Sequence, residues 1–301
     1  MSNLPKTPTT RQLGNSGIEI SSLAWGMWRF AGQDVAAATE LVHAALDAGI
    51  TVFDTADIYG FGEQGFGAAE ELLGEVFAEN PDLRGRMVLA SKGGITPPVP
   101  YDSSAEYLTK AIDNSLRRLR VEQIDLWQIH RPDILTHPSE IARTIEDAVK
   151  AGKVRAFGVS NFTVAQIATL KQFSSVPIVS TQPELSPLRI DTIENGELDQ
   201  AMAMNMAVLA WSPLGGGRIA DPQSQREQAV AAALSGVAAA HGVSRTAAAY
   251  SWIMAHPARP VPIIGSQNPA RIAEAVDAYK VNWTRADWYA VLVAARGVAL
   301  P

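Results

Sequence analysis

The chain has no cysteine among its 301 residues, so it can form neither a disulfide framework nor a thiolate site. Its net charge of −6 argues against a surface for nucleic acid or for anionic membranes. No apolar run approaches the length of a membrane span, and the polar start lacks the apolar core of a signal peptide. These absences predict a soluble, cytoplasmic protein that binds neither nucleic acid nor membrane.

Phosphate-binding signatures of two common α/β folds are missing as well. No GxGxxG motif follows the first expected strand, and GxxxxGK[ST] occurs nowhere. No charge block or change of composition divides the chain, and 47% of its residues are hydrophobic. Although this length would allow two domains of average size, we expect a single domain, 1–301, with a large core.

What the chain does contain is a repeated pattern of an apolar strand followed by a helix. The helix expected at 105–119 shows it well, with a capping-box pattern from Ser103 to Glu106 and Leu108, Ile112 and Leu116 on one side. Strands are expected at 22–26, 52–54, 87–92, 124–130, 156–160, 178–182, 207–211 and 261–264.

Eight such units predict an α/β fold, the (β/α)8 TIM barrel. An N-terminal β-hairpin over 11–21, which turns at Gly14-Asn15-Ser16-Gly17, would close the barrel bottom, and an extra C-terminal helix is expected at 285–295. An open doubly wound sheet is the rival architecture, but its phosphate signature is absent.

Polar side chains that could take part in catalysis lie at the ends of three expected strands. In the stretch GITVFDTADIYG, Asp54 ends a strand and Tyr59 follows within a glycine-flanked loop. Lys92 ends the next strand, and His130 ends the one after it. Because the carboxyl ends of parallel strands share one face, we expect these four side chains to meet there.

Together, the four groups suit the delivery of a proton to a carbonyl oxygen. An ammonium at Lys92 would favour the phenolate of Tyr59 and lower its pKa from about 10. Asp54 would keep Lys92 protonated and oriented, and a neutral His130 could hydrogen-bond the carbonyl. None of these side chains can donate hydride, so a nicotinamide cofactor would have to supply it.

With these motifs the sequence resembles the aldo-keto reductase family along nearly its whole length. The family's catalytic tetrad matches Asp54 and Tyr59 in FDTADIYG, Lys92 in LASKGG and His130 in DLWQIHRPD. The resemblance implies an NADPH-dependent enzyme that reduces an aldehyde or ketone to an alcohol. This reaction needs no metal, and we take a monomer as the default state. The small carbonyl substrate would contact Trp28, Tyr59 and His130.

The resemblance also implies a set of cofactor contacts. Ser160 and Asn161 in GVSNF, with Gln182, would hold the nicotinamide carboxamide, and Trp211 in WSPLGGG would stack on the ring. Further contacts would come from the strand end at Gly26, Met27 and Trp28, and along the pyrophosphate from the loop residues Ser212, Leu214, Gly215 and Arg218.

A last motif, GSQNPARIAEA, is similar to the family's segment for the 2′-phosphate of NADP. By this resemblance Ser266 and Arg271 would bind the phosphate and Glu274 would face the adenine. Gly265 stands where many family members have a phosphate-binding lysine, a departure that bears on the preference for NADPH over NADH.

Two other classes of function remain open at this stage. The first is a metal-assisted barrel hydrolase built on Asp54, Asp57, His130 and Asp133, although no compact His-x-His or His-E-x-x-His pair supports it. The second is an NADPH-binding sensor or regulatory subunit on the same fold with little turnover, similar to the potassium-channel β-subunits.

Overall fold

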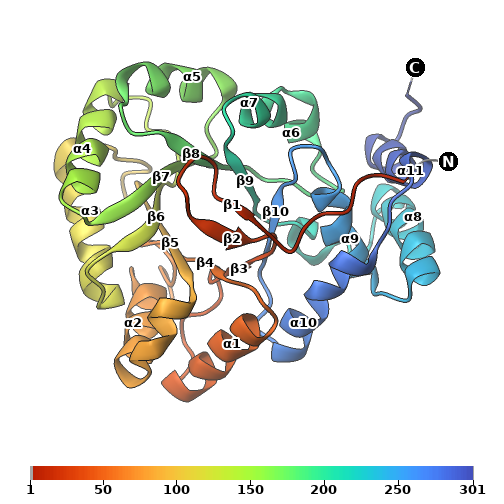
Figure 1. Ribbon diagram of the computed structural model, residues 1–301, viewed down its shortest axis with the longest axis horizontal. Coiled ribbons are helices and arrows are strands. Elements are labelled where there is room, and N and C mark those ends of the chain that lie inside the picture. Colours follow the sequence, from red (N-terminus) through yellow and green to blue (C-terminus); the bar gives the residue numbers. More distant parts are fainter. Residues whose placement is uncertain (1–2, 301) are drawn as a thin grey trace.

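Eight parallel strands close into a barrel in the computed structural model, which describes residues 3–300 (Figure 1). The order around the barrel is β10-β3-β4-β5-β6-β7-β8-β9, so each strand lies beside its sequence neighbour and β10 closes the ring against β3. The predicted (β/α)8 TIM barrel is therefore confirmed. Its strands are β3 (Ala24–Gly26), β4 (Val52–Asp54), β5 (Val88–Gly93), β6 (Ile124–Ile129), β7 (Val154–Ser160), β8 (Ile178–Gln182), β9 (Ala207–Ala210) and β10 (Val261–Ile264).

Helices surround the strands and cover the outside of the barrel (Figure 1). The expected C-terminal helix is α11, which packs against α8. The short α6 was not predicted, and the helix expected after the last strand divides into α10 and the 3₁₀ helix η3. The α-helices are α1 (Val35–Asp47), α2 (Ala68–Glu79), α3 (Ala105–Leu119), α4 (Pro138–Lys150), α5 (Val164–Phe173), α6 (Asp191–Glu194), α7 (Glu197–Ala203), α8 (Gln225–His241), α9 (Arg245–Met254), α10 (Pro269–Glu274) and α11 (Arg285–Arg296). The 3₁₀ helices are η1 (Pro81–Arg86), η2 (Gly215–Gly217) and η3 (Ala275–Lys280).

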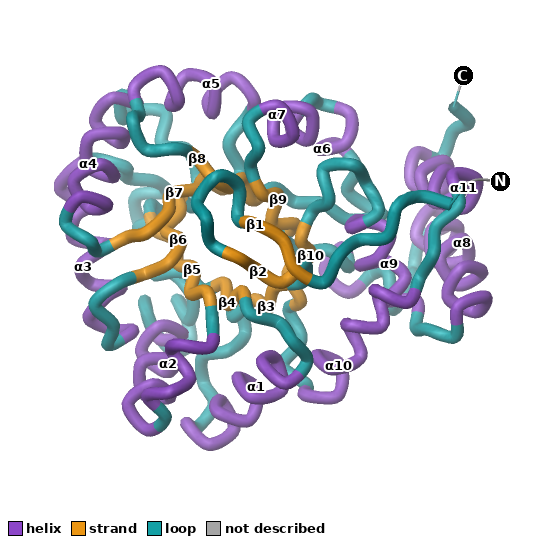
Figure 2. The backbone as a smooth tube through the Cα atoms, in the orientation of Figure 1, coloured by secondary structure: helices purple, strands orange, loops and turns teal. Residues whose placement is uncertain are grey.

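The N-terminal hairpin lies across one opening of the barrel, as predicted (Figure 2). Strands β1 (Thr10–Gln12) and β2 (Glu19–Ser21) pair antiparallel. Leu13, Ile18 and Ile20 are buried in one cluster with the inward-facing residues of the barrel strands. The hairpin turn requires glycine, because a Cβ at Gly14 would come within 2.4 Å of the Val179 carbonyl oxygen and the φ there is +53°. With this end closed, chemistry is left to the opposite mouth.

Helix starts follow local capping, with one difference from expectation. Thr163 and Gln166 form a full capping box at the start of α5. At α3 the cap is Ser104, whose side chain accepts a hydrogen bond from the Tyr107 backbone N–H, so the predicted box starting at Ser103 is wrong. Ser103 instead donates its backbone N–H to Asp133, 3.0 Å away. Either of two successive serines could cap the helix, and the contact of Ser103 with Asp133 leaves Ser104 as the cap.

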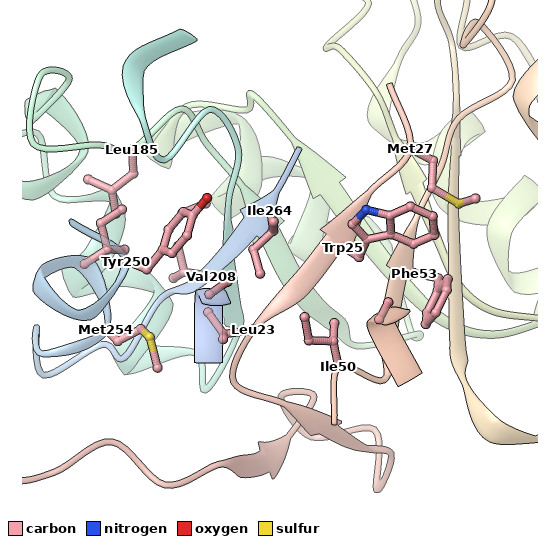
Figure 3. Close-up of a cluster of buried hydrophobic side chains, with 14 of the residues drawn as sticks. Leu23, Trp25, Met27, Ile50, Phe53, Leu185, Val208, Tyr250, Met254 and Ile264 are labelled. Atoms are coloured by element: carbon pink, nitrogen blue, oxygen red, sulfur yellow. The ribbon is translucent and has the colours of Figure 1, made fainter. Parts of the chain in front are cut away.

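The core between barrel and helices fixes the strand ends that carry the polar residues. Figure 3 shows Trp25, Met27 and Phe53 in this layer, where all three side chains are fully buried. The Trp25 ring meets the rings of Phe30 and Phe53 edge to face, at centroid distances of 5.5 and 5.3 Å. Such close packing leaves the backbone at the ends of β3 and β4 little freedom.

Across residues 3–300, no helix combines the length and hydropathy that a membrane crossing would require.

Candidate active site

The ends of β4 and β5 bring Asp54 and Lys92 together at the open mouth of the barrel. The Lys92 ammonium donates to Asp54 Oδ2 at 2.7 Å and to the Thr55 carbonyl at 2.8 Å. Both side chains are buried, with exposed fractions of 0% and 2%. Such a pair is tolerated in a low-dielectric interior only when the charges face each other and their remaining sites are hydrogen-bonded, as they are here.

Tyr59 and His130 lie over this buried pair. The Lys92 Nζ atom is 5.1 Å from the centroid of the Tyr59 ring, and the His130 ring centroid is 5.9 Å from it. Tyr59 is anchored through its backbone, which accepts from the Ala69 N–H at 3.1 Å at the start of α2. The four predicted tetrad residues therefore form one cluster at the carboxyl ends of three adjacent strands.

The pKa of Tyr59 shifts in the direction opposite to the one expected from sequence. Burial raises the pKa of the phenol, and the attraction of the Lys92 charge offsets that effect only in part. The error arose because a sequence shows that a cation is near but not how completely the phenol is desolvated. The consequence is that Tyr59 is held protonated, the form that a proton donor must have.

The other two ionisable partners are held in defined charge states. Burial alone would lower the pKa of Lys92, but the negative charge of Asp54 and the contact with Tyr59 outweigh burial and raise it. Burial, reinforced by the positive charges of Lys92 and Arg131, lowers the pKa of His130 well below its usual value. The cluster thus combines an ammonium with a neutral imidazole.

The depressed pKa of His130 predicts a specific dependence of stability on pH. Below about pH 6.5 the unfolded chain takes up a proton that the folded site refuses, so His130 lowers the stability as pH falls through that range. We expect His130→Gln to remove a slope of up to about 1.4 kcal/mol per pH unit from the free energy of unfolding between pH 7 and pH 5. Urea unfolding at several pH values measures it.

The exposed His137, which caps α4, gives the matched control for this measurement. His137→Gln removes an imidazole outside the site, so it controls for the loss of a histidine as such. Identical slopes for His130→Gln and the unchanged protein would show that the imidazole at 130 accepts protons freely in the folded state.

The residues expected to hold a nicotinamide carboxamide form one hydrogen-bonded chain beside the cluster. The Asn161 amide donates to the His130 carbonyl at 3.1 Å, and its oxygen accepts from the Trp211 indole at 3.0 Å. Ser160 Oγ donates to the Gln182 carbonyl at 2.9 Å, and the Gln182 amide donates to Asp54 at 2.9 Å. No hydrogen bond formed within residues 3–300 uses the Gln182 amide oxygen, which leaves an acceptor for an amide N–H.

The three residues expected at the end of β3 differ in what they offer. Trp28 is 61% exposed, and its ring meets the Tyr59 ring edge to face at 5.1 Å. The Met27 side chain belongs to the core, so only its backbone is available at the mouth. A Cβ at Gly26 would collide with Ile263 at 2.6 Å, so the glycine allows β3 to pack closely against β10.

The loop after β9 is held by its own contacts. Ser212 Oγ accepts from the Gly216 N–H at 3.0 Å, and Arg218 donates to the Gly215 carbonyl at 2.7 Å. Arg218 also forms an ion pair with Glu227 at 3.4 Å. Leu214 packs against the core. The loop is therefore held in place by its own hydrogen bonds, and Arg218 is partly committed to Glu227.

The segment after β10 places the remaining predicted residues further out. The Ser266 hydroxyl accepts from the Asn268 N–H at 3.2 Å, and the Ser266 carbonyl accepts from the Trp25 indole at 2.9 Å. Arg271 and Glu274 are exposed on α10. Ser266, Arg271 and Glu274 lie in one segment of the chain, which includes the exposed side of α10.

Arginines at the mouth are functional candidates that sequence reasoning did not single out. The Arg131 guanidinium lies 5.7 Å from the centroid of the Trp211 ring, and its charge helps to lower the pKa of His130 while it opposes the rise in the pKa of Tyr59. The sequence could have indicated Arg131 through its position directly after His130. The second arginine is Arg29, which directly follows Trp28.

The carboxylates of the alternative metal site do not converge. Asp54 is paired with Lys92, Asp57 accepts from the Tyr107 hydroxyl at 3.3 Å, and Asp133 accepts from the backbone N–H groups of Ser103 and Leu135. Over residues 3–300, His, Asp and Glu side chains form no group of three or more that could hold a metal ion.

The closed barrel defines the fold as a (β/α)8 barrel with a cluster of ionisable side chains at its mouth, and comparisons with known proteins supply the class. Residues 22–292 match the model of the Aldo/keto reductase family. The chain belongs to the aldo/keto reductase family, and it is an oxidoreductase. Members of this family generally use a nicotinamide cofactor.

Individual relatives cover nearly the whole chain. It is 67% identical to a 6-dehydroglucose reductase of Novosphingobium aromaticivorans over 100% of both chains. It is 36% identical to a 6-dehydroglucose reductase of Agrobacterium fabrum, over 93% of this chain and 96% of the relative. Among solved structures it is similar to a glycerol dehydrogenase from Gluconobacter oxydans, with a TM-score of 0.85, 28% identity and 97% coverage of each chain.

Proposed function

We propose that the protein reduces an aldehyde or ketone to an alcohol with NADPH. The observation that carries the proposal is the buried Lys92–Asp54 pair beneath Tyr59, beside a His130 whose pKa is far below its usual value. An ammonium, a neutral phenol and a neutral imidazole that converge at a barrel mouth suit protonation of a carbonyl oxygen.

Each side chain has a distinct role in this proposal. Tyr59 donates the proton to the carbonyl oxygen, and Lys92, held by Asp54, stabilises the phenolate that forms. His130 donates a hydrogen bond that orients the carbonyl under the phenol. The bound nicotinamide supplies the hydride to the carbonyl carbon. No metal takes part in these roles.

The residues around the tetrad fit a nicotinamide. The free amide oxygen of Gln182 would accept from the carboxamide, beside Ser160 and Asn161. Trp211, whose ring is oriented by its bond to Asn161, would stack on the nicotinamide ring. The loop with Ser212, Leu214, Gly215 and Arg218, and the strand end at Gly26, Met27 and Trp28, would line the remaining path toward Ser266, Arg271 and Glu274.

For the substrate we propose a polyhydroxylated aldehyde, with 6-dehydroglucose as the first candidate. Support comes from the two relatives that carry the name 6-dehydroglucose reductase, at 67% and 36% identity. The exposed ring of Trp28 beside Tyr59 offers a flat apolar face for the C–H groups of a sugar. Arg131, across the mouth, offers donors for hydroxyl groups.

A carbonyl panel followed by NADPH absorbance, run in parallel with NADH, tests this function. We expect oxidation of NADPH with 6-dehydroglucose, slower oxidation with unsubstituted aliphatic aldehydes, and weaker use of NADH. Tight NADPH binding without oxidation by any carbonyl would contradict the proposal and favour a cofactor-sensing role.

The 2′-phosphate of NADPH gives a separate prediction at Arg271. If its guanidinium binds that phosphate, Arg271→Ala should raise the Kd for NADPH by about 10- to 100-fold, since a charge-assisted hydrogen bond is worth about 1.5–3 kcal/mol. The Kd for NADH should remain unchanged. Isothermal titration calorimetry measures both, with Arg117→Ala on the exposed side of α3 as control. Equal losses for the two nucleotides would mean that Arg271 does not distinguish them.

A further inference from the structure

The loops after β10 and β3 are joined at the open mouth of the barrel. The two strands pair in parallel with Ile264 beside Trp25, so Gly265 emerges next to the end of β3. The Trp25 indole donates to the Ser266 carbonyl at 2.9 Å, and the Gln267 amide donates to the Gly26 carbonyl at 3.4 Å. A side chain from one loop can therefore lie beside the residues of the other loop.

Arg29 faces the space that Gly265 leaves open. Its Nη1 atom is the nearest atom to a Cβ built on Gly265, at 4.0 Å. The backbone at Gly265 lies outside the left-handed region, so no strain demands a glycine there. No ion pair or hydrogen bond formed within residues 3–300 uses the Arg29 guanidinium, which is exposed. The arrangement is a free cation beside a position that carries no side chain.

We propose that Arg29, which lies beside the space left open at Gly265, binds the diphosphate of the dinucleotide. This inference rests on the proposed function, because it assumes a nicotinamide dinucleotide at this mouth. Arg29 directly follows Trp28 in the loop after β3, and Gly265 opens the segment that leads from β10 to Arg271 on α10. The group that links the two halves of the dinucleotide would cross this position, and the planar guanidinium fork suits phosphate oxygens.

Calorimetric titration with NADPH, NADH and ADP-ribose tests the assignment without measuring turnover. All three probes carry the diphosphate, and only NADPH carries the 2′-phosphate. We expect Arg29→Gln to raise the Kd of all three by about tenfold, with a weaker dependence of Kd on salt than in the unchanged protein. Arg117→Gln on α3 serves as the control for loss of a surface charge.

A rescue variant separates a role in binding from a structural one. A Cβ at position 265 would lie near only the far end of Arg29, so the backbone there can accept Gly265→Lys. In the double variant with Arg29→Gln, this lysine restores one positive charge to the same space. We expect Arg29→Gln/Gly265→Lys to recover most of the affinity lost in Arg29→Gln for all three probes.

Two results would overturn the inference while leaving the proposed function standing. Unchanged affinity of Arg29→Gln would show that this side chain does not contact the nucleotide. A loss confined to NADPH would assign Arg29 to the 2′-phosphate and not to the diphosphate. If the unchanged protein binds none of the three probes, the proposed function itself fails, and the inference fails with it.

Discussion

Replacing Tyr59 by phenylalanine is expected to lower kcat for carbonyl reduction by about 100- to 10,000-fold, the range for loss of a positioned general acid. The hydroxyl is the only group removed, and burial keeps that hydroxyl protonated in the unchanged protein. The ring contacts with Trp28 and His130 remain, so the Kd for NADPH should be nearly unchanged. Steady-state kinetics and calorimetric titration of the same preparation measure both quantities.

A matched control for this result is Tyr289→Phe, since Tyr289 is 44% exposed on α11 and far along the chain from the tetrad. That variant should keep the kcat of the unchanged protein. Substantial carbonyl reduction by Tyr59→Phe would show that another group delivers the proton, and the role assigned to Tyr59 would have to be abandoned.

The second large effect is expected on stability, at an ion pair that takes no part in the proposed chemistry. Glu70 of α2 pairs with Arg118 of α3 at 2.7 Å, and also accepts a hydrogen bond from Ser91 of β5. Both charged side chains are buried, with exposed fractions of 0% and 7%. Glu70→Gln leaves the guanidinium charge buried without a counter-charge, which should lower the free energy of unfolding by about 3 kcal/mol.

Urea unfolding followed by tryptophan fluorescence measures this loss. The control is Glu106→Gln, which removes the carboxylate from an exposed i,i+4 pair with Lys110 on the same helix as Arg118. A surface pair of this kind contributes little, so its unfolding curve should match that of the unchanged protein. Equal curves for Glu70→Gln and Glu106→Gln would contradict the claim that burial makes the α2–α3 pair important.

The sequence was informative about the fold because its signals are local and repeated. Eight apolar runs alternate with helix patterns, and all eight runs became barrel strands. The hairpin was recognisable from its glycine-flanked turn. The capping residue of α3 was not, because the choice between Ser103 and Ser104 depends on Asp133, thirty residues away on another loop. Short-range patterns cannot report such contacts.

The candidate site was predictable to the extent that residue type and strand end determine it. Asp54, Lys92, Tyr59 and His130 were found because parallel strands deliver their ends to one face. The direction of the Tyr59 pKa shift could not be predicted, because it is set by the balance between burial and nearby charges. The pairing of Arg29 with the space at Gly265 was also invisible, since it requires the closure of the barrel between its last and first strands.

The most direct test of the central claim follows the hydride itself. NADPH with both C4 hydrogens of the dihydronicotinamide replaced by deuterium should be incubated with the unchanged protein and 6-dehydroglucose, and the isolated product examined by mass spectrometry and NMR. We expect a single deuterium on the new alcohol carbon, and less of this alcohol by at least about 100-fold in a parallel reaction with the Tyr59→Phe variant stopped at the same time. An alcohol formed without deuterium, or no alcohol from any carbonyl in the panel, would contradict the proposed reduction.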